Sequence, residues 1–143
     1  MILYLDTSAL VKLYAEEEGS GLVRKVVRDS DLTATSVMAY AEARSALARK
    51  SRSREISRPA LTQCKREFER DWLRLHRLPI DETLIRKAGQ LAEEYALRAL
   101  DALHLATADS LQIALRDVVI FACFDGALNE AAEARGLALL VRS

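Results

Sequence analysis

Short strand-like runs alternate with longer segments of helical periodicity along this chain of 143 residues. The strand-like runs lie at 2–5, 32–35, 78–80, 118–124 and 137–141. Between them, apolar residues recur every three or four positions, as they do along one face of a helix. Strands that alternate with helices favour an α/β fold, here a central, mostly parallel sheet of about five strands flanked by helices.

The segments with helical periodicity are separated by few breaks. We expect helices at 9–14, 22–27, 36–50, 61–75, 81–95 and 125–135, another that Asp101 opens, and an arginine-rich loop at 51–57. Asp81 is the expected cap of its helix, since Asp is a preferred N-cap residue. With five Gly, two Pro, no internal repeat and no linker, residues 1–143 are predicted to form a single domain.

Composition excludes several classes of protein. No apolar run approaches the roughly 20 residues that span a bilayer, and the N-terminus lacks the pattern of a signal peptide. We therefore expect a cytoplasmic protein that does not enter a membrane. Cys64 and Cys123 lack the spacing of a zinc site or of a disulfide framework, so both are expected to be buried thiols.

Four acidic residues stand where predicted elements begin or end. Asp6 follows the first strand, Glu42 lies one turn into the helix that starts near Ser36, Asp101 opens a helix, and Asp125 follows the strand at 118–124. Parallel sheets gather ligands at the carboxyl ends of their strands. Two carboxylates ~5 Å apart repel by roughly 3 kcal/mol at an effective dielectric near 20. Four that converge would need a hard divalent cation such as Mg²⁺ or Mn²⁺.

Each of the four acids also has a simpler interpretation. Asp6, Asp101 and Asp125 are residues of the type that caps helices, and Glu42 could lie on the surface. Glu42 is the most informative of the four, because its helical neighbours Met38, Ala41 and Ser45 are of core or near-core type. His104 could face the same pocket as the acids, although such a histidine is more often packed and hydrogen-bonded.

The charge of the chain is balanced but unevenly distributed. Residues 44–77 hold 11 basic and 4 acidic side chains, a net charge of +7, between flanks of net −3 and −4. Clustered Lys and Arg are typical of phosphate contacts, although a solvated helix face gives the same pattern.

Four segments carry a resemblance to a known family. They are Leu5–Leu10, Ala39–Leu47, Leu100–Ala108 and Phe124–Leu128. In order and spacing they resemble the signature segments of PIN-domain ribonucleases. The length of the chain and the order of these segments are similar to those of the VapC-type toxins of toxin–antitoxin systems. The resemblance covers essentially the whole chain. It implies a metal-dependent endoribonuclease that hydrolyses RNA, with an antitoxin partner and a homodimeric state.

The resemblance also implies roles for individual residues. Asp6, Glu42, Asp101 and Asp125 would be catalytic, with Asp6 and Asp101 as the main ligands of Mg²⁺ or Mn²⁺ and the other two binding directly or through water. Ser8 and Asn129 would support the site. Arg44, Arg49 and Lys50 would contact RNA. The family often has Thr or Ser where this chain has Cys123, which puts a water-orienting hydroxyl there in doubt.

Other interpretations remain open. A phosphoacceptor receiver also has an Asp after its first strand, but it normally adds a late lysine, and none follows Lys87 here. A dehalogenase-type phosphatase has a second Asp where this chain has Ser8. A catalytically inactive PIN-like module that binds RNA or protein would keep the fold without the activity.

Overall fold

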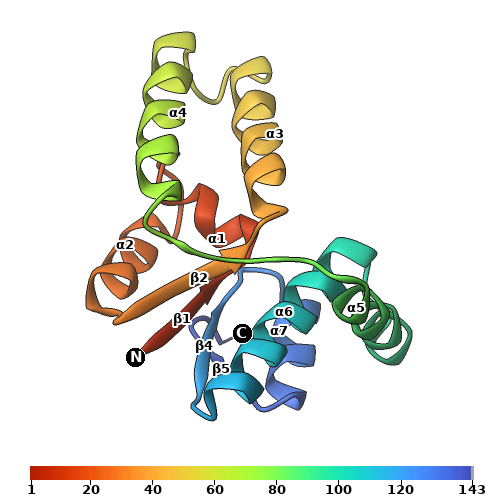
Figure 1. The fold of residues 1–143 in the computed structure, drawn as a ribbon. Coiled ribbons are helices and arrows are strands. Elements are labelled where there is room, and N and C mark those ends of the chain that lie inside the picture. Colours follow the sequence, from red (N-terminus) through yellow and green to blue (C-terminus); the bar gives the residue numbers. More distant parts are fainter. Residues whose placement is uncertain (143) are drawn as a thin grey trace.

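Five parallel strands form the centre of the molecule, in the order β3-β2-β1-β4-β5 (Figure 1). The computed structural model describes residues 1–142. The strands are β1 (Ile2–Leu5), β2 (Leu32–Ser36), β3 (His76–Leu78), β4 (Val119–Ala122) and β5 (Ala138–Leu139). All four pairings are parallel. The predicted α/β architecture is confirmed, and β1 lies in its middle.

Helices connect the strands, as parallel pairing requires. They are α1 (Thr7–Val11), α2 (Ser20–Asp29), α3 (Ala39–Arg52), α4 (Arg58–Trp72), α5 (Glu82–Tyr95), α6 (Ala99–Leu115) and α7 (Gly126–Ala134). Asp81 caps α5, as predicted, by accepting a hydrogen bond from the backbone N–H of Leu84 at 2.8 Å. Within residues 1–142, no helix is both long enough and apolar enough to cross a membrane.

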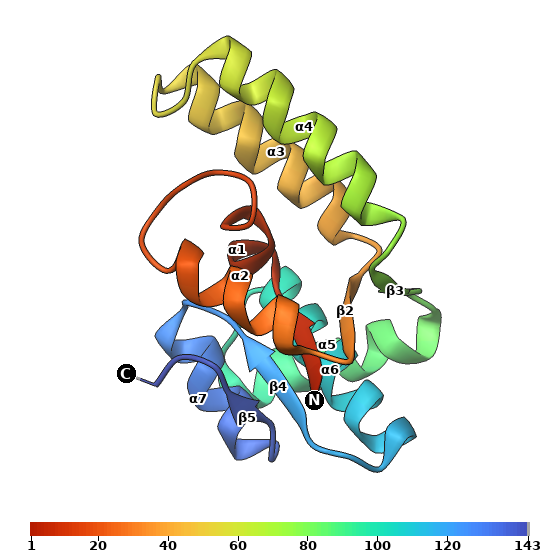
Figure 2. The ribbon, with the colours of Figure 1, turned by 90° about the vertical axis from the view of Figure 1, so that its left-hand side faces the viewer.

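The sheet separates two apolar cores. Successive residues of a strand point to opposite faces, so Tyr4 packs on one side of β1 while Leu3 and Leu5 pack on the other. The core around Tyr4 includes residues of α5, α6 and α7, and the core around Leu3 and Leu5 includes residues of α1, α2, α3 and α4. Figure 2 shows α1 and α2 on one side of the sheet and α5 and α6 on the other.

Several boundaries differ from the sequence prediction. Strands β4 and β5 are shorter than the predicted runs 118–124 and 137–141, and α1 and α4 each begin and end earlier than predicted. Strand β3 is His76–Leu78 rather than 78–80, because its pairing with β2 ends at Leu78, directly before a proline that has no N–H to donate. Helix α3 begins at Ala39 rather than Ser36, because Ser36 is the last residue of β2. Asp101 does not open its helix: α6 begins at Ala99, and Asp101 lies in its first turn.

Helices α3 and α4 and the connection 53–57 form a hairpin that projects away from the sheet (Figure 1). Its base is held by a cluster of rings: Phe68 stacks against Tyr40 at 5.5 Å and lies 5.6 Å from Trp72. The connection is shorter than the predicted loop at 51–57, since α3 continues to Arg52. The base of the α3–α4 hairpin thus belongs to the same core as Leu3 and Leu5.

Candidate active-site cleft

An open cleft of ≈ 760 Å³ lies beyond the carboxyl ends of β1 and β4, and all four predicted acids line it. Asp6 directly follows β1, Asp125 comes three residues after β4, Glu42 lies in the first turn of α3, and Asp101 lies in the first turn of α6. We call this feature the acidic cleft. The structure thus brings together four residues that are far apart in the sequence.

Asp6 is fixed at the floor of the acidic cleft. It is 5% exposed, and its Oδ1 accepts hydrogen bonds from the Ser8 hydroxyl at 2.7 Å and from the backbone N–H of Ala9 at 2.9 Å. The second of these bonds caps α1. The simpler interpretation of Asp6 as a helix cap is therefore correct, and it is compatible with a place in the cleft. The Ser8 hydroxyl also accepts from the backbone N–H of Phe124 at 3.4 Å, which links the two strand ends.

Glu42 is held by a buried hydrogen-bond network. The Thr7 hydroxyl donates to Glu42 Oε1 at 2.7 Å, and His104 Nε2 lies 2.9 Å from the same oxygen. On its other side, His104 Nδ1 lies 2.7 Å from the hydroxyl of Tyr4, which is fully buried. A carboxylate oxygen can only accept, so Nε2 donates to Glu42, and in the matching neutral tautomer Nδ1 accepts from the phenol of Tyr4, whose pKa is raised by burial. The imidazole then carries its proton on Nε2, facing Glu42.

The charge of Glu42 follows from this network. Burial alone would raise the pKa of Glu42, but the hydrogen bonds from His104 and Thr7 outweigh it and lower the pKa below its usual value. Glu42 is therefore a carboxylate at neutral pH. Neither Thr7 nor the link from His104 to Tyr4 was anticipated from the sequence.

Asp101 and Asp125 complete the rim. Arg98 Nε donates to Asp101 Oδ2 at 3.3 Å, an ion pair on the surface because the arginine side chain is 86% exposed. Asp125 caps α7 by accepting from the backbone N–H of Leu128 at 3.0 Å. Cys123 is fully buried; its thiol donates to the Asp125 carbonyl and accepts from the Asp125 N–H at 3.3 Å. Burial raises the pKa of Cys123, so this side chain stays a neutral thiol that supports the Asp125 turn.

The other predicted site residues divide into two groups. Arg49 and Lys50 line the acidic cleft. Arg44 and Asn129 do not: Arg44 pairs with Glu69 at 2.7 Å, and the buried Asn129 donates from Nδ2 to the Cys123 carbonyl at 2.9 Å.

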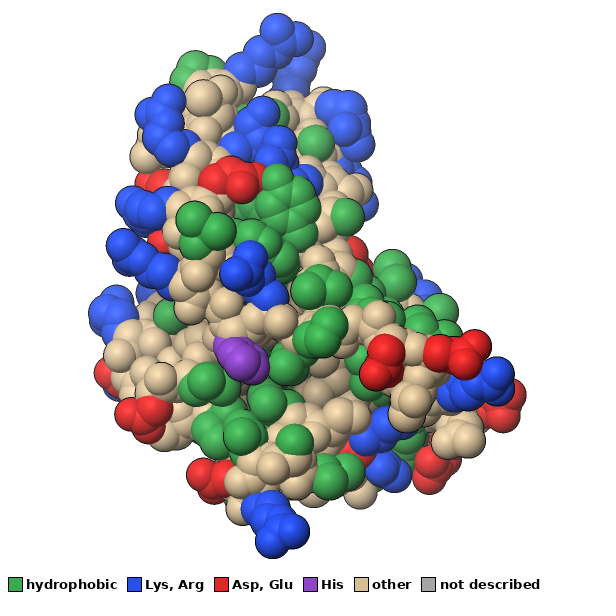
Figure 3. All heavy atoms as spheres, viewed as in Figure 1, with side chains coloured by type: hydrophobic (Ala, Val, Ile, Leu, Met, Phe, Trp, Pro, Cys, Tyr) green, Lys and Arg blue, Asp and Glu red, His purple; other side chains and the backbone are tan. Residues whose placement is uncertain are grey.

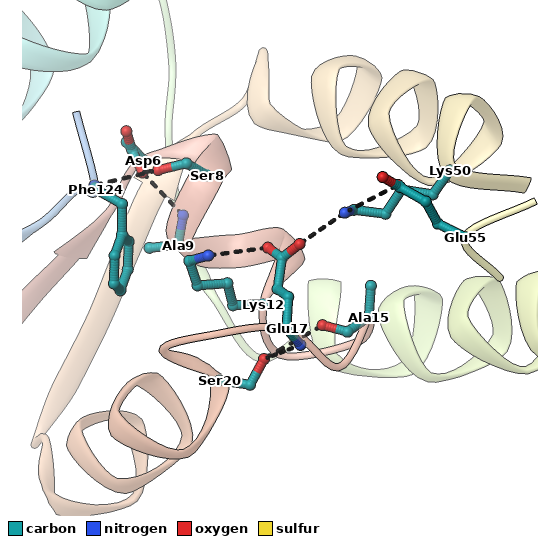
Figure 4. Close-up of polar contacts among 10 residues, drawn as sticks. All are labelled: Asp6, Ser8, Ala9, Lys12, Ala15, Glu17, Ser20, Lys50, Glu55 and Phe124. Atoms are coloured by element: carbon teal, nitrogen blue, oxygen red, sulfur yellow. Dashed lines mark hydrogen bonds and ion pairs between the residues drawn. The ribbon is translucent and has the colours of Figure 1, made fainter. Parts of the chain in front are cut away.

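Glu17 and Lys50, which also line the cleft, belong to a cluster of charged side chains (Figure 4). The carboxylate of Glu17 bridges Lys12 at 3.0 Å and Lys50 at 2.6 Å, and all three side chains are at least 70% buried. Lys12 Nζ also lies 4.5 Å from the centre of the Phe124 ring. Glu17 therefore ties α1 to α3 and, through Lys12, to the segment that carries Asp125. Nothing in the sequence pattern indicated this role for Glu17.

The donor set of the acidic cleft fits a hard divalent cation in its chemistry. Carboxylate oxygens are the ligands that Mg²⁺ and Mn²⁺ prefer. As the side chains stand, no three His, Cys, Asp or Glu residues among 1–142 lie close enough to share a metal ion. Asp101 is instead paired on the surface with Arg98. Such exposed pairs contribute only about 0–1 kcal/mol, so a cation can replace the arginine as the partner of Asp101.

Comparison with known proteins agrees with this geometry. The family model of the PIN domain matches residues 3–134. Ribonuclease VapC45 of Mycobacterium tuberculosis is 35% identical over 136 residues, which are 94% of this chain and 92% of that protein. Ribonuclease VapC46 of the same species is 34% identical over 142 residues, with 99% and 98% covered.

Solved structures show the same fold at low sequence identity. FitAcB from Neisseria gonorrhoeae has a TM-score of 0.69 and 18% identity, with 96% of each chain covered. VapBC2 from Rickettsia felis, bound to a DNA fragment from its promoter, has a TM-score of 0.61 and 16% identity, with 97% of each chain covered. The resemblance found in the sequence is confirmed: the chain belongs to the PIN domain family, and its curated relatives are VapC ribonucleases.

Proposed function

We propose that this protein is a divalent-metal-dependent endoribonuclease and the toxin of a toxin–antitoxin pair. The observation that carries the proposal is the convergence of Asp6, Glu42, Asp101 and Asp125 on one open cleft. The relatives named as VapC ribonucleases, matched over more than 90% of the chain, support the reaction. The structural neighbours described as toxin–antitoxin complexes support the biological role.

The acids of the cleft have distinct proposed tasks. Asp6 and Asp101 would be the main ligands of Mg²⁺ or Mn²⁺, with Glu42 and Asp125 binding directly or through water. A bound divalent cation supplies charge stabilisation at the scissile phosphate and an activated water at neutral pH. Glu42, whose lowered pKa keeps it ionised, can accept hydrogen bonds but cannot donate a proton. Ser8 and His104 hold Asp6 and Glu42 in place.

The margin of the cleft suits an RNA strand. Arg49 and Lys50 lie on the α3 wall of the cleft. Arg49 can contact a phosphate there, and Lys50 can do so by exchanging its partner Glu17 for a phosphate. An antitoxin that inserts a basic side chain between the carboxylates would block the same cleft. A homodimeric state and a cytoplasmic location, where RNA and an antitoxin are available, belong to the same proposal.

Cleavage of a mixed cellular RNA pool tests the proposal. Purified protein, free of any antitoxin, should produce discrete fragments with Mg²⁺ or Mn²⁺ and none with EDTA. Asp6→Asn should abolish cleavage. Asp81→Asn is the matched control, because Asp81 also caps a helix but lies outside the cleft, and Asn retains capping ability at both positions.

Two outcomes would contradict the assignment. Cleavage by Asp6→Asn at the wild-type rate would remove Asp6 from the reaction. RNA binding by folded protein without cleavage under either metal would favour an inactive binding module.

A further inference from the structure

The tip of the α3–α4 hairpin carries arginines that the protein itself does not neutralise. Arg52, Arg54 and Arg58 are exposed, and none of them forms an ion pair within residues 1–142. Together with Ser51, Ile56 and Ser57 they line a hollow of ≈ 640 Å³, and we call these six residues the hairpin tip. Figure 3 shows Lys and Arg side chains over the end and the sides of the hairpin.

The backbone of the hairpin tip is tied into a defined turn. The N–H of Ser53 donates to the Arg49 carbonyl and that of Glu55 to the Lys50 carbonyl, both at 2.9 Å. Ser57 caps α4 by accepting from the Ala60 N–H at 3.1 Å. These bonds hold the arginines on a fixed turn. Glu55 is the one acidic residue between Arg49 and Arg58, and it lies 3.5 Å from Lys50.

The hairpin tip continues the wall of the acidic cleft. Glu42, Ser45 and Arg49 line the cleft from successive turns of α3, and Arg52 follows in the last turn of the same helix. Ten residues of helix separate Glu42 from Arg52, or about 15 Å at 1.5 Å per residue. A stacked strand that rises about 3.4 Å per nucleotide covers this distance in roughly four to five nucleotides.

We propose that the hairpin tip binds the phosphates of single-stranded RNA that extends beyond the acidic cleft, so that the substrate is an RNA reaching at least four to five nucleotides past the cut. This inference rests on the proposed function. Arginine suits phosphate because its planar fork donates two parallel hydrogen bonds. An acidic protein partner is the less favoured occupant, because Ile56 is the one apolar side chain lining the hollow, and the centre of a protein interface is usually apolar.

Binding of two RNA lengths tests the inference without cleavage. In the Asp6→Asn background, Arg52→Gln, Arg54→Gln and Arg58→Gln are combined and compared with the combination Arg28→Gln, Arg86→Gln and Arg116→Gln. The second set removes three equally exposed arginines outside the hairpin. Fluorescence anisotropy over a salt series is recorded with labelled single strands of about 4 and about 16 nucleotides.

We expect the tip variant to lose at least tenfold in affinity for the longer strand, with its salt slope reduced by about 2, and to bind the shorter strand as before. The control set should leave both affinities within about twofold. Equal effects of the two triple variants on the longer strand would overturn the inference. So would a tip-dependent affinity for polyglutamate with no tip dependence for RNA.

Cleavage assays separate this inference from the proposed function. If the wild-type protein cuts RNA and the tip variant cuts long and short strands at unchanged rates, the hairpin tip is not a substrate surface and the nuclease assignment stands. If the wild-type protein cuts no RNA but binds the longer strand through the tip, the nuclease assignment fails and the RNA-binding surface stands.

Discussion

The hydroxyl of Tyr4 offers a sharp test of the network that supports Glu42. Tyr4→Phe removes one oxygen atom and keeps the ring, which stacks on Phe121 at a centroid distance of 5.7 Å. The substitution leaves His104 Nδ1 without its donor at a site where the histidine is 2% exposed. A buried polar atom left without a partner costs about 1–3 kcal/mol. We expect that loss in the free energy of unfolding, or a fall in Tm of about 3 °C per kcal/mol for a chain of this size.

Urea denaturation of the wild type and of Tyr4→Phe measures this loss, with an unchanged m value showing that the unfolded state is the same. Tyr14→Phe is the matched control, because Tyr14 donates to Asp71 at 3.1 Å and the Asp71 side chain is 31% exposed, so water can replace the lost bond. The Tyr4 variant should be the less stable of the two by about 1 kcal/mol. Equal stability of the two variants would refute the inferred network.

Three further predictions concern the turn at Gly19, the charge of Glu42 and the packing of Phe68 in the α3–α4 hairpin. Gly19 has φ +92°, and an added Cβ would lie 2.7 Å from the Phe124 ring. Gly19→Ala should therefore lower the free energy of unfolding by more than about 1 kcal/mol, as measured in thermal melts. Gly21 has open space around it, so Gly21→Ala should be neutral or stabilising. The pKa of Glu42 is lower in the folded protein than in the unfolded chain, so its carboxylate stabilises the fold at pH values above the unfolded-state pKa. This stabilisation is lost as the pH falls through the folded-state pKa. The difference in unfolding free energy between the wild type and Glu42→Gln should therefore shrink as the pH falls from neutral into the acidic range where this carboxyl is protonated, and a difference that grows on acidification would contradict this sign. Phe68→Ala, at a fully buried position of the hairpin, should cost about 3–5 kcal/mol in urea unfolding, and a cost below about 1 kcal/mol would show that the ring cluster is dispensable.

Local patterns were sufficient to predict much of the fold and the position of the acids. Asp6 and Asp125 each follow an apolar run, and the rule that parallel strands present their carboxyl ends at one edge places both in one cleft. The same patterns did not define where helices begin. Asp101 has the residue type of an N-cap, yet α6 starts two residues earlier, because a capping preference of about 1 kcal/mol yields to the packing of a helix with nine buried residues.

The side-chain contacts inside the acidic cleft could not be predicted, because they join residues that are far apart in the sequence. Glu42 meets Thr7 and His104, which are 35 and 62 residues away along the chain, and no local pattern encodes which side chains a fold will bring together. Helix α4 shows the same limit in packing. Its apolar spacing predicts a helix with one buried face, but a face that covers the sheet and one that covers another helix have the same periodicity.

The central place of β1 has a consequence for synthesis of the chain. Strand β1 pairs with β4 (Val119–Ala122), which is made much later in the chain, and the backbone N–H of Asp6 donates to the carbonyl of Ala122. Asp125, the last member of the acidic cleft, follows three residues later. A nascent chain therefore cannot pair β1 with β4 or assemble its four carboxylates until the segment that ends at Asp125 has been made. By this order of assembly, a growing chain gains its complete acidic cleft only late in synthesis.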